Sequence, residues 1–156
     1  MDHKLKLMVV DDSPLFRTWL IRSLSEDDRF QVVGYAVNAL DAQEKIPLLQ
    51  PDMLTLDIEM PGMSGIDFLK QLLPVHPIPV ILVSSLNLRV FDALEAGAVD
   101  FVRKPDEANG LSKEIFLSML RSKLMVAAAS HVHLPSAPAD PQAGGIRKVS
   151  SLPPAR

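Results

Sequence analysis

Short apolar runs alternate with helix-forming segments along the first 126 residues of the chain. The runs are rich in β-branched residues and bounded by polar or turn residues, a pattern that predicts strands. Apolar side chains on both faces of a run are typical of parallel sheets that helices cover on both sides. The predicted strands are residues 5–10, 31–36, 53–56, 79–83 and 99–102. This alternation predicts an α/β fold.

Helices are predicted between and after these strands, at residues 15–25, 39–49, 64–73, 87–96 and 111–127. Ser13 is expected to cap the first helix, with Pro14 at its first position, and Asn38 stands where it could cap the second. Pro47 is expected to end or kink the second helix at Ile46. Right-handed crossovers between parallel strands then favour a doubly wound five-stranded parallel sheet flanked by helices, as in flavodoxin-like proteins.

The composition changes near residue 127. Every Trp, Tyr and Phe precedes residue 117, whereas the last 30 residues are rich in Pro and Ala and contain the pair Gly144-Gly145. Such a segment cannot bury enough apolar surface to offset the entropy lost on ordering. We therefore expect a domain over residues 4–126 and a linker or disordered tail over 127–156.

The charge and residue usage exclude several functional classes. A net charge of −3 and a pI near 5.8 argue against sequence-independent binding to nucleic acid or to an anionic membrane. The chain has no Cys, which excludes a thiolate nucleophile and fits a reducing compartment. No apolar stretch approaches the roughly 20 residues of a membrane helix, and no signal peptide is visible. A cytoplasmic protein is expected.

Polar side chains follow four of the predicted strands. Asp11 and Asp12 follow the first, Asp57 the third, Ser84 the fourth and Lys104 the fifth. The carboxyl ends of parallel strands share one edge of the sheet, so these groups should converge there. Clustered carboxylates are costly without a cation, and Mg2+ prefers oxygen ligands. The pattern predicts a metal site that accepts a phosphoryl group, with the lysine and the hydroxyl facing the anion.

Each feature also has a purely structural explanation. Asp11 and Asp12 precede a helix, where acidic residues are favoured without any function. Asp57 could be a solvated strand end, Ser84 could cap a loop, and Lys104 could be a surface lysine before a turn. Their coincidence at the ends of four strands favours the functional interpretation.

Four stretches of the sequence resemble the receiver domain of bacterial two-component response regulators. They are VDDS at 10–13, LTLDIEMPGMSG at 54–65, VSS at 83–85 and GAVDFVRKP at 97–105. The resemblance covers about residues 4–126. Within that family, TLDIEMP at 55–61 and PIPVILVSSL at 77–86 are most similar to chemotaxis members whose receiver precedes a protein-glutamate methylesterase domain.

The resemblance implies a role for each matched acidic residue. Asp57 corresponds to the aspartate that accepts the phosphoryl group. Asp11 and Asp12 correspond to the acidic pair that holds Mg2+ together with Asp57, and the backbone carbonyl of Glu59 is the expected further ligand. Positioning and charge neutralisation supply most of the catalysis in phosphoryl transfer, which suits this set of groups.

The resemblance also implies roles for residues on the later strands. Lys104 would contact the phosphoryl group, and Pro105 would follow a cis peptide bond. Ser84 would be the switch hydroxyl, and Phe101 would change rotamer with it, altering the face formed by the fourth helix, fifth strand and fifth helix. A phenylalanine in a strand can equally be plain core.

Three functions remain open at this point. The leading hypothesis is a phosphorelay module that accepts a phosphoryl group from a histidine kinase, of chemotaxis type, and switches a partner or effector. The second is the regulatory half of a methylesterase acting on chemoreceptor glutamates. No Gly-x-Ser-x-Gly motif is present, so this chain itself should perform only receiver self-phosphorylation and dephosphorylation. The third, a haloacid-dehalogenase-like phosphatase, is disfavoured because Glu59 stands where a second Asp is expected.

Overall fold

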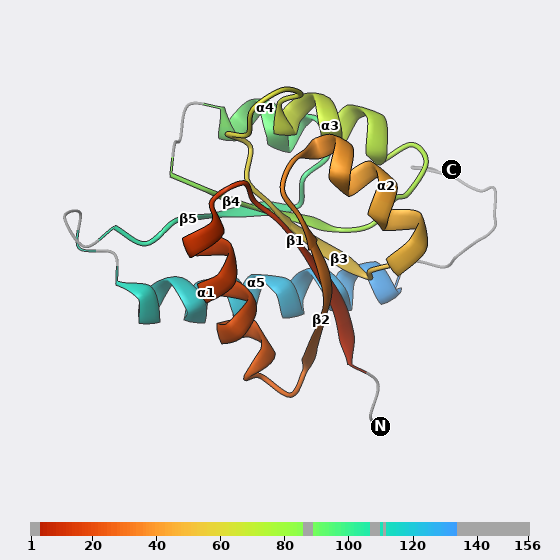
Figure 1. The fold of residues 1–156 in the computed structure, drawn as a ribbon. Helices are drawn as coiled ribbons and strands as arrows, with labels where there is room; N and C mark the ends of the chain where they lie inside the picture. The colour runs from red at the N-terminus through yellow and green to blue at the C-terminus, as the bar shows by residue number, and fades with distance from the viewer. Residues whose placement is uncertain (1–3, 86–88, 107–109, 111, 134–156) are drawn as a thin grey trace, which may run out of the picture.

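The computed structural model of the chain describes residues 4–85, 89–106, 110 and 112–133 (Figure 1). Its parallel strands form one five-stranded sheet in the order β2-β1-β3-β4-β5. The strands are β1 (Leu5–Val10), β2 (Phe30–Ala36), β3 (Met53–Leu56), β4 (Val80–Ser84) and β5 (Asp100–Arg103). The helices are α1 (Pro14–Ser25), α2 (Ala39–Leu49), α3 (Gly65–Leu72), α4 (Val90–Glu95) and α5 (Lys113–His133). The predicted α/β fold is confirmed.

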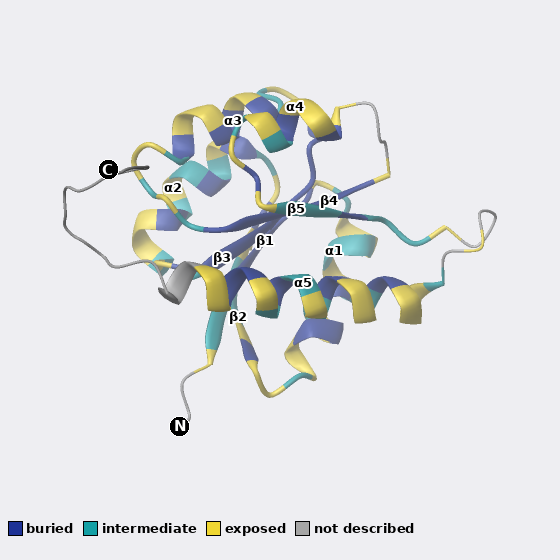
Figure 2. Ribbon diagram, turned by 180° about the vertical axis from the view of Figure 1, so that it is seen from behind, coloured by how far each residue is buried: buried dark blue, intermediate teal, exposed yellow. Residues whose placement is uncertain are grey.

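The sheet lies between two helical layers. Helices α1 and α5 cover one face, and α2, α3 and α4 cover the other (Figure 1). Successive residues of β1 serve the two layers in turn, because side chains alternate across a strand. Leu7 and Val9 pack in the cluster beneath α1 and α5, whereas Met8 and Val10 pack in the opposite cluster. The central strands β3 and β4 and the second half of β1 are accordingly buried, and exposed residues gather on the outer sides of the helices (Figure 2).

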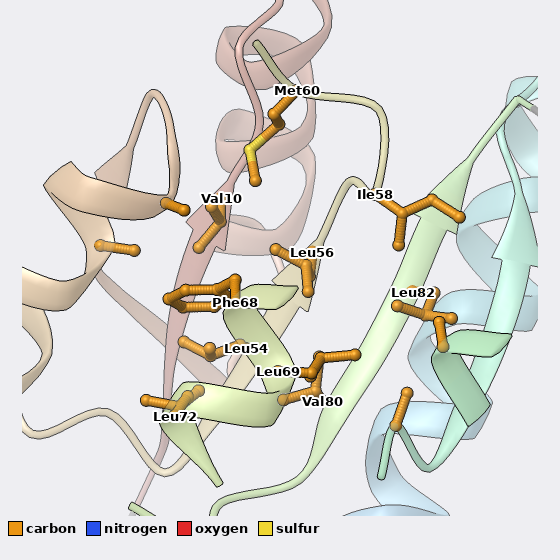
Figure 3. Packing of buried hydrophobic residues seen from close by; sticks show 14 of the residues in the cluster. Val10, Leu54, Leu56, Ile58, Met60, Phe68, Leu69, Leu72, Val80 and Leu82 are labelled. Carbon is orange, nitrogen blue, oxygen red and sulfur yellow. The ribbon is translucent and has the colours of Figure 1, made fainter. Parts of the chain in front are cut away.

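The larger apolar cluster joins α3 to the central strands. Phe68 and Leu69 of α3 pack with Leu54 and Leu56 of β3 and with residues of β1 and β4 (Figure 3). Phe68, Leu69, Leu54 and Leu56 are all fully buried. This packing holds the end of β3, and hence the segment that follows it, in a defined place against the rest of the sheet.

The strand order reverses its direction between β1 and β3. From β1 the chain moves outward to β2 and then returns to the other side of β1 to form β3. In doubly wound sheets, ligands bind at such a reversal, beyond the carboxyl ends of the strands. Val10 pairs with Leu56 in register, and the N–H of Asp57 donates to the Val10 carbonyl at 3.0 Å. The residues that follow the two strands therefore start side by side.

Two helices end later than their local sequence suggests. α2 continues to Leu49, so Pro47 does not end it; Gln50 closes the helix in a left-handed conformation with its N–H on the Ile46 carbonyl. α5 continues to His133, beyond the expected end at residue 127. Ala127 and Ala128 are buried in the cluster beneath α5. The boundary expected at residue 126 thus falls inside α5, and residues 134–156 of the predicted tail lie outside the described residues.

Two smaller expectations also differ from the structure. Ser13 occupies the cap position of α1, but its side chain makes no capping hydrogen bond. No peptide bond among the described residues is cis, so the prediction of a cis bond before Pro105 is wrong. Trans is the lower-energy isomer of an X–Pro bond. Among the described helices, none has both the length and the apolar character to cross a membrane.

Candidate functional site

Three carboxylates meet at the carboxyl ends of the neighbouring strands β1 and β3. Asp11 and Asp57 are 2% and 4% exposed, and Asp12 is exposed at the rim. One oxygen of each carboxylate lies within 4.8 Å of one oxygen of the others. The structure thus brings together the three aspartates that the sequence placed at strand ends.

Backbone amides orient the two buried carboxylates. The N–H of Ser13 donates to Asp11 Oδ1 at 2.8 Å, and the N–H of Glu59 donates to Asp57 Oδ1 at 2.9 Å. Each bond closes a turn of two residues after a strand, a conformation that aspartate favours. In both cases the Oδ2 atom is left to pair with another group.

Lys104 links the two Oδ2 atoms. Its ammonium lies 3.0 Å from Asp11 Oδ2 and 3.2 Å from Asp57 Oδ2, and its side chain is 17% exposed. The residue follows β5, and its N–H donates to the carbonyl of Ser84 at the end of β4. The lysine therefore reaches Asp57 past β4, and Asp11 past β4 and β3, from a backbone position fixed by its bond to Ser84.

The charges in this site do not balance. Burial raises the pKa of Asp57 and Asp11 adds to the increase, although the Glu59 N–H and the Lys104 ammonium act in the opposite direction. Burial by itself would lower the pKa of Lys104, but the two carboxylates outweigh it and the pKa is raised. Lys104 stays charged and is shared between Asp11 and Asp57, with Asp12 beside them. A divalent cation with a preference for hard oxygen ligands fits this excess of negative charge.

A tight backbone contact supports the segment after Asp57. Gly65 begins α3 directly against Ile58, and a Cβ atom built on Gly65 would lie 2.6 Å from the Cα atom of Ile58. Any other residue would push the two segments apart. The glycine therefore allows α3 to hold the segment that carries Asp57 and Glu59.

The remaining predicted residues lie around this centre. Ser84 is the last residue of β4, is 1% exposed and neighbours Lys104 through the backbone bond between β4 and β5. Phe101 is half-buried in β5, packs against the cluster beneath α3, and has Lys123 Nζ 5.6 Å from its ring centroid. The Glu59 side chain is exposed and outside the carboxylate group; its carbonyl as a ligand stays a prediction.

Two residues of α1 contact the site without having been predicted. Lys104 Nζ lies 4.6 Å from the centroid of the Phe16 ring. Arg17 donates from Nη1 to the backbone carbonyl of Asp11 at 2.9 Å and lies over the ring of Tyr35. Both follow Asp12 within the first turns of the next helix, and Phe16 fitted the apolar pattern of that helix. Nothing in the pattern separated a core phenylalanine from one that faces a lysine.

Comparisons with known proteins agree with this geometry. The family model described as "Response regulator receiver domain" matches residues 7–116. A protein-glutamate methylesterase/protein-glutamine glutaminase 2 of Syntrophomonas wolfei is 46% identical over 130 residues, which are 83% of this chain and 38% of that protein. The homologue of the same name in Vibrio vulnificus is 43% identical over 136 residues, which are 85% of this chain and 39% of that protein. The chain thus spans less than half the length of these relatives.

Solved structures show the same similarity. The response regulator domain of Thermotoga maritima CheB has a TM-score of 0.74 and 37% identity, and the match covers 81% of this chain and 98% of that domain. A structure of the P1 domain of CheA3 in complex with CheY6 from R. sphaeroides matches with a TM-score of 0.67 and 28% identity, covering 80% of this chain and 97% of that chain.

Proposed function

This chain belongs to the response regulator receiver domain family, and on that premise we propose that it is a signalling switch that accepts a phosphoryl group on Asp57 from a histidine kinase. The observation that carries the proposal is the contact of buried Asp57 with Lys104 at 3.2 Å, beside two further carboxylates. Asp57 supplies the nucleophile, and the other groups supply positioning and charge.

The proposed reaction is a displacement at phosphorus. A carboxylate oxygen of Asp57 forms a bond to phosphorus while the bond from phosphorus to the imidazole nitrogen of the donor breaks, and that nitrogen keeps the electron pair. Lys104 lies where it can pair with the oxygens of the arriving phosphoryl group. Asp11, Asp12, Asp57 and the carbonyl of Glu59 would hold Mg2+, which neutralises charge on the transferred group when bound.

The proposed output begins at the ends of β4 and β5. A phosphoryl group on Asp57 adds negative charge and acceptor oxygens next to Lys104 and near the strand that ends at Ser84. The Ser84 hydroxyl would move toward it, and the half-buried Phe101 ring would turn inward. This change would reach a partner through α4, β5 and α5.

We place the chain in chemotaxis signalling. Support comes from the CheY6 structure, which is a complex with the P1 domain of CheA3, and from the sequence relatives, which are protein-glutamate methylesterases. A second candidate follows from those relatives: the chain would be the regulatory part of a protein-glutamate methylesterase that acts on chemoreceptors. Both functions use the same phosphorylated Asp57, and a cytoplasmic location belongs to both.

Phosphorylation by a small donor tests the proposal. We expect acetyl phosphate with Mg2+ to give an acid-labile adduct by intact mass, and no adduct without Mg2+ or in the Asp57→Asn variant. Asp28→Asn, which changes an aspartate outside the site, is the matched control and should label normally. Labelling that persists in Asp57→Asn excludes Asp57 as the acceptor. Activation of methylesterase activity when the phosphorylated chain is joined to such a domain would favour the second candidate.

A further inference from the structure

Lys104 has an aromatic neighbour as well as two carboxylate partners. The ring of Phe16 lies beneath its ammonium, with Nζ 4.6 Å from the ring centroid, inside the range of a cation–π contact. Asp11 and Asp57 hold the ammonium through charge, whereas the ring holds it through its π face. The two kinds of contact respond differently when charge is added at Asp57.

The Phe16 ring is itself fixed by neighbouring rings. Its centroid lies 5.6 Å from that of Trp19 in α1 and 5.8 Å, in an edge arrangement, from that of Phe116 in α5. Trp19 and Phe116 also contact one another at 5.9 Å. Phe116 is fully buried, so this aromatic cluster is anchored in the core beneath α5. The cluster therefore presents the Phe16 ring to Lys104 as a fixed surface.

We propose that Phe16 is a positioning residue for Lys104, and this inference rests on the proposed function of Asp57. A lysine side chain is long and flexible, and ordering it has an entropic cost. The Phe16 ring limits the positions of the ammonium to the edge of the site, independently of which carboxylate it pairs with. Lys104 is then already beside Asp57 when a phosphoryl group arrives. Because Phe116 belongs to α5, the packing of α5 also contributes to the placement of Lys104.

Substitutions at Phe16 separate the π contact from simple packing. Phe16→Leu keeps an apolar side chain without a π face, and Phe16→Tyr keeps the ring. From the size of cation–π contacts, we expect Phe16→Leu to slow labelling of Asp57 by acetyl phosphate about two- to fivefold, and Phe16→Tyr to stay close to the unmodified chain. Leu15→Ala is the matched control, because Leu15 is the preceding residue and 88% exposed. Equal slowing in Phe16→Leu and Phe16→Tyr, or normal labelling in Phe16→Leu, would overturn the proposal.

A second measurement does not depend on phosphorylation. The Phe16 ring current should shift the ε-methylene protons of Lys104 upfield in the NMR spectrum of the unphosphorylated chain, with the signals assigned through Lys104→Arg. We expect the shift to persist in Phe16→Tyr and to vanish in Phe16→Leu, or in Phe16→Met if the leucine variant does not fold. Absence of the shift in the unmodified chain overturns the positioning role. If Asp57 is not labelled at all but the shift is present, the proposed function fails while the contact between Phe16 and Lys104 stands.

Discussion

Replacing Asp57 with asparagine should stabilise the chain in metal-free buffer at neutral pH. The substitution removes a buried negative charge and retains an oxygen that can accept the N–H of Glu59. Burial and Asp11 raise the pKa of Asp57 above its ordinary value of 3.8. A carboxyl whose pKa is raised in the folded state loses stabilising free energy as the pH rises from its unfolded pKa to that folded pKa. The advantage of the Asp57→Asn variant should therefore be absent in acid and appear as the pH rises above 3.8.

The distances set the size of this effect. With an effective dielectric constant near 20, repulsion between Asp11 and Asp57, whose oxygens lie within 4.8 Å, is about 3 kcal/mol. Attraction between Asp57 and Lys104 at 3.2 Å is about 5 kcal/mol on the same scale. Burial of an ion costs several kcal/mol more, so the two unfavourable terms exceed the attraction. We expect Asp57→Asn to raise the free energy of unfolding by about 1–2 kcal/mol at pH 7.

Urea unfolding with and without Mg2+ measures the cost of the buried Asp57 charge and the stabilisation that the cation supplies. In EDTA, Asp57→Asn should have the higher midpoint at pH 7 and the same midpoint as the unmodified chain near pH 3. Mg2+ at ten times its Kd should stabilise the unmodified chain by about 1.4 kcal/mol and the variant by less, because the variant has lost one ligand. Asp28→Asn should show neither effect. A variant that is less stable in EDTA at pH 7, or an advantage that does not depend on pH, would show that the buried charge of Asp57 does not destabilise the chain.

Two further predictions concern stability away from the charged centre. The side-chain hydrogen bond from Arg29 lowers the pKa of Asp27 to about 2, although burial acts in the opposite direction. Arg121 Nε lies 3.5 Å from Asp27 Oδ2 and also favours the ionised carboxylate. This depressed pKa gives stability that is present above pH 3.8 and lost as the pH falls toward 2. Arg29 is half exposed, so solvent weakens this ion pair. Asp27→Asn should therefore lower the free energy of unfolding in urea by only about 1 kcal/mol at pH 7. Equal stability of the two proteins at pH 7 would contradict this. Gly65→Ala should lower the free energy of unfolding by about 1–3 kcal/mol, because its Cβ atom would lie 2.6 Å from the Cα atom of Ile58. It should also slow phosphorylation of Asp57. An unchanged Tm would exclude the clash.

The fold and the centre of the site were predictable because they depend on short-range patterns. Apolar runs such as 53–56 and 79–83 predict strands, and parallel strands share a carboxyl edge. Asp11, Asp57 and Lys104 stand at those ends, and the structure brings both carboxylates within ion-pair distance of the lysine. The roles that the resemblance implies for Ser84 and Phe101 stay predictions, since they concern a change between two states.

The sequence predicted the ends of helices less well, because tertiary packing decides where a helix stops. Pro47 removes one backbone donor and predicts a helix end, but α2 continues for two residues to Leu49, and the N–H of Gln50 still bonds to the Ile46 carbonyl. The tail composition predicts a boundary near residue 127, yet Ala127 and Ala128 are buried in the cluster beneath α5 and the helix continues to His133. Composition averages over a segment, whereas burial is decided residue by residue.

The amino-acid sequence alone predicted the alternation of strands and helices, the shared edge at the carboxyl ends of the strands, and the carboxylates that follow the first and third strands. Each of these depends on residue type, on periodicity and on position along the chain. The packing of helices on the sheet decided that Asp11 and Asp57 share one lysine, and that Phe16 faces this lysine and not the core alone. Those contacts join residues far apart in the chain, so the distance and burial that set their energies exist only once the helices have packed on the sheet.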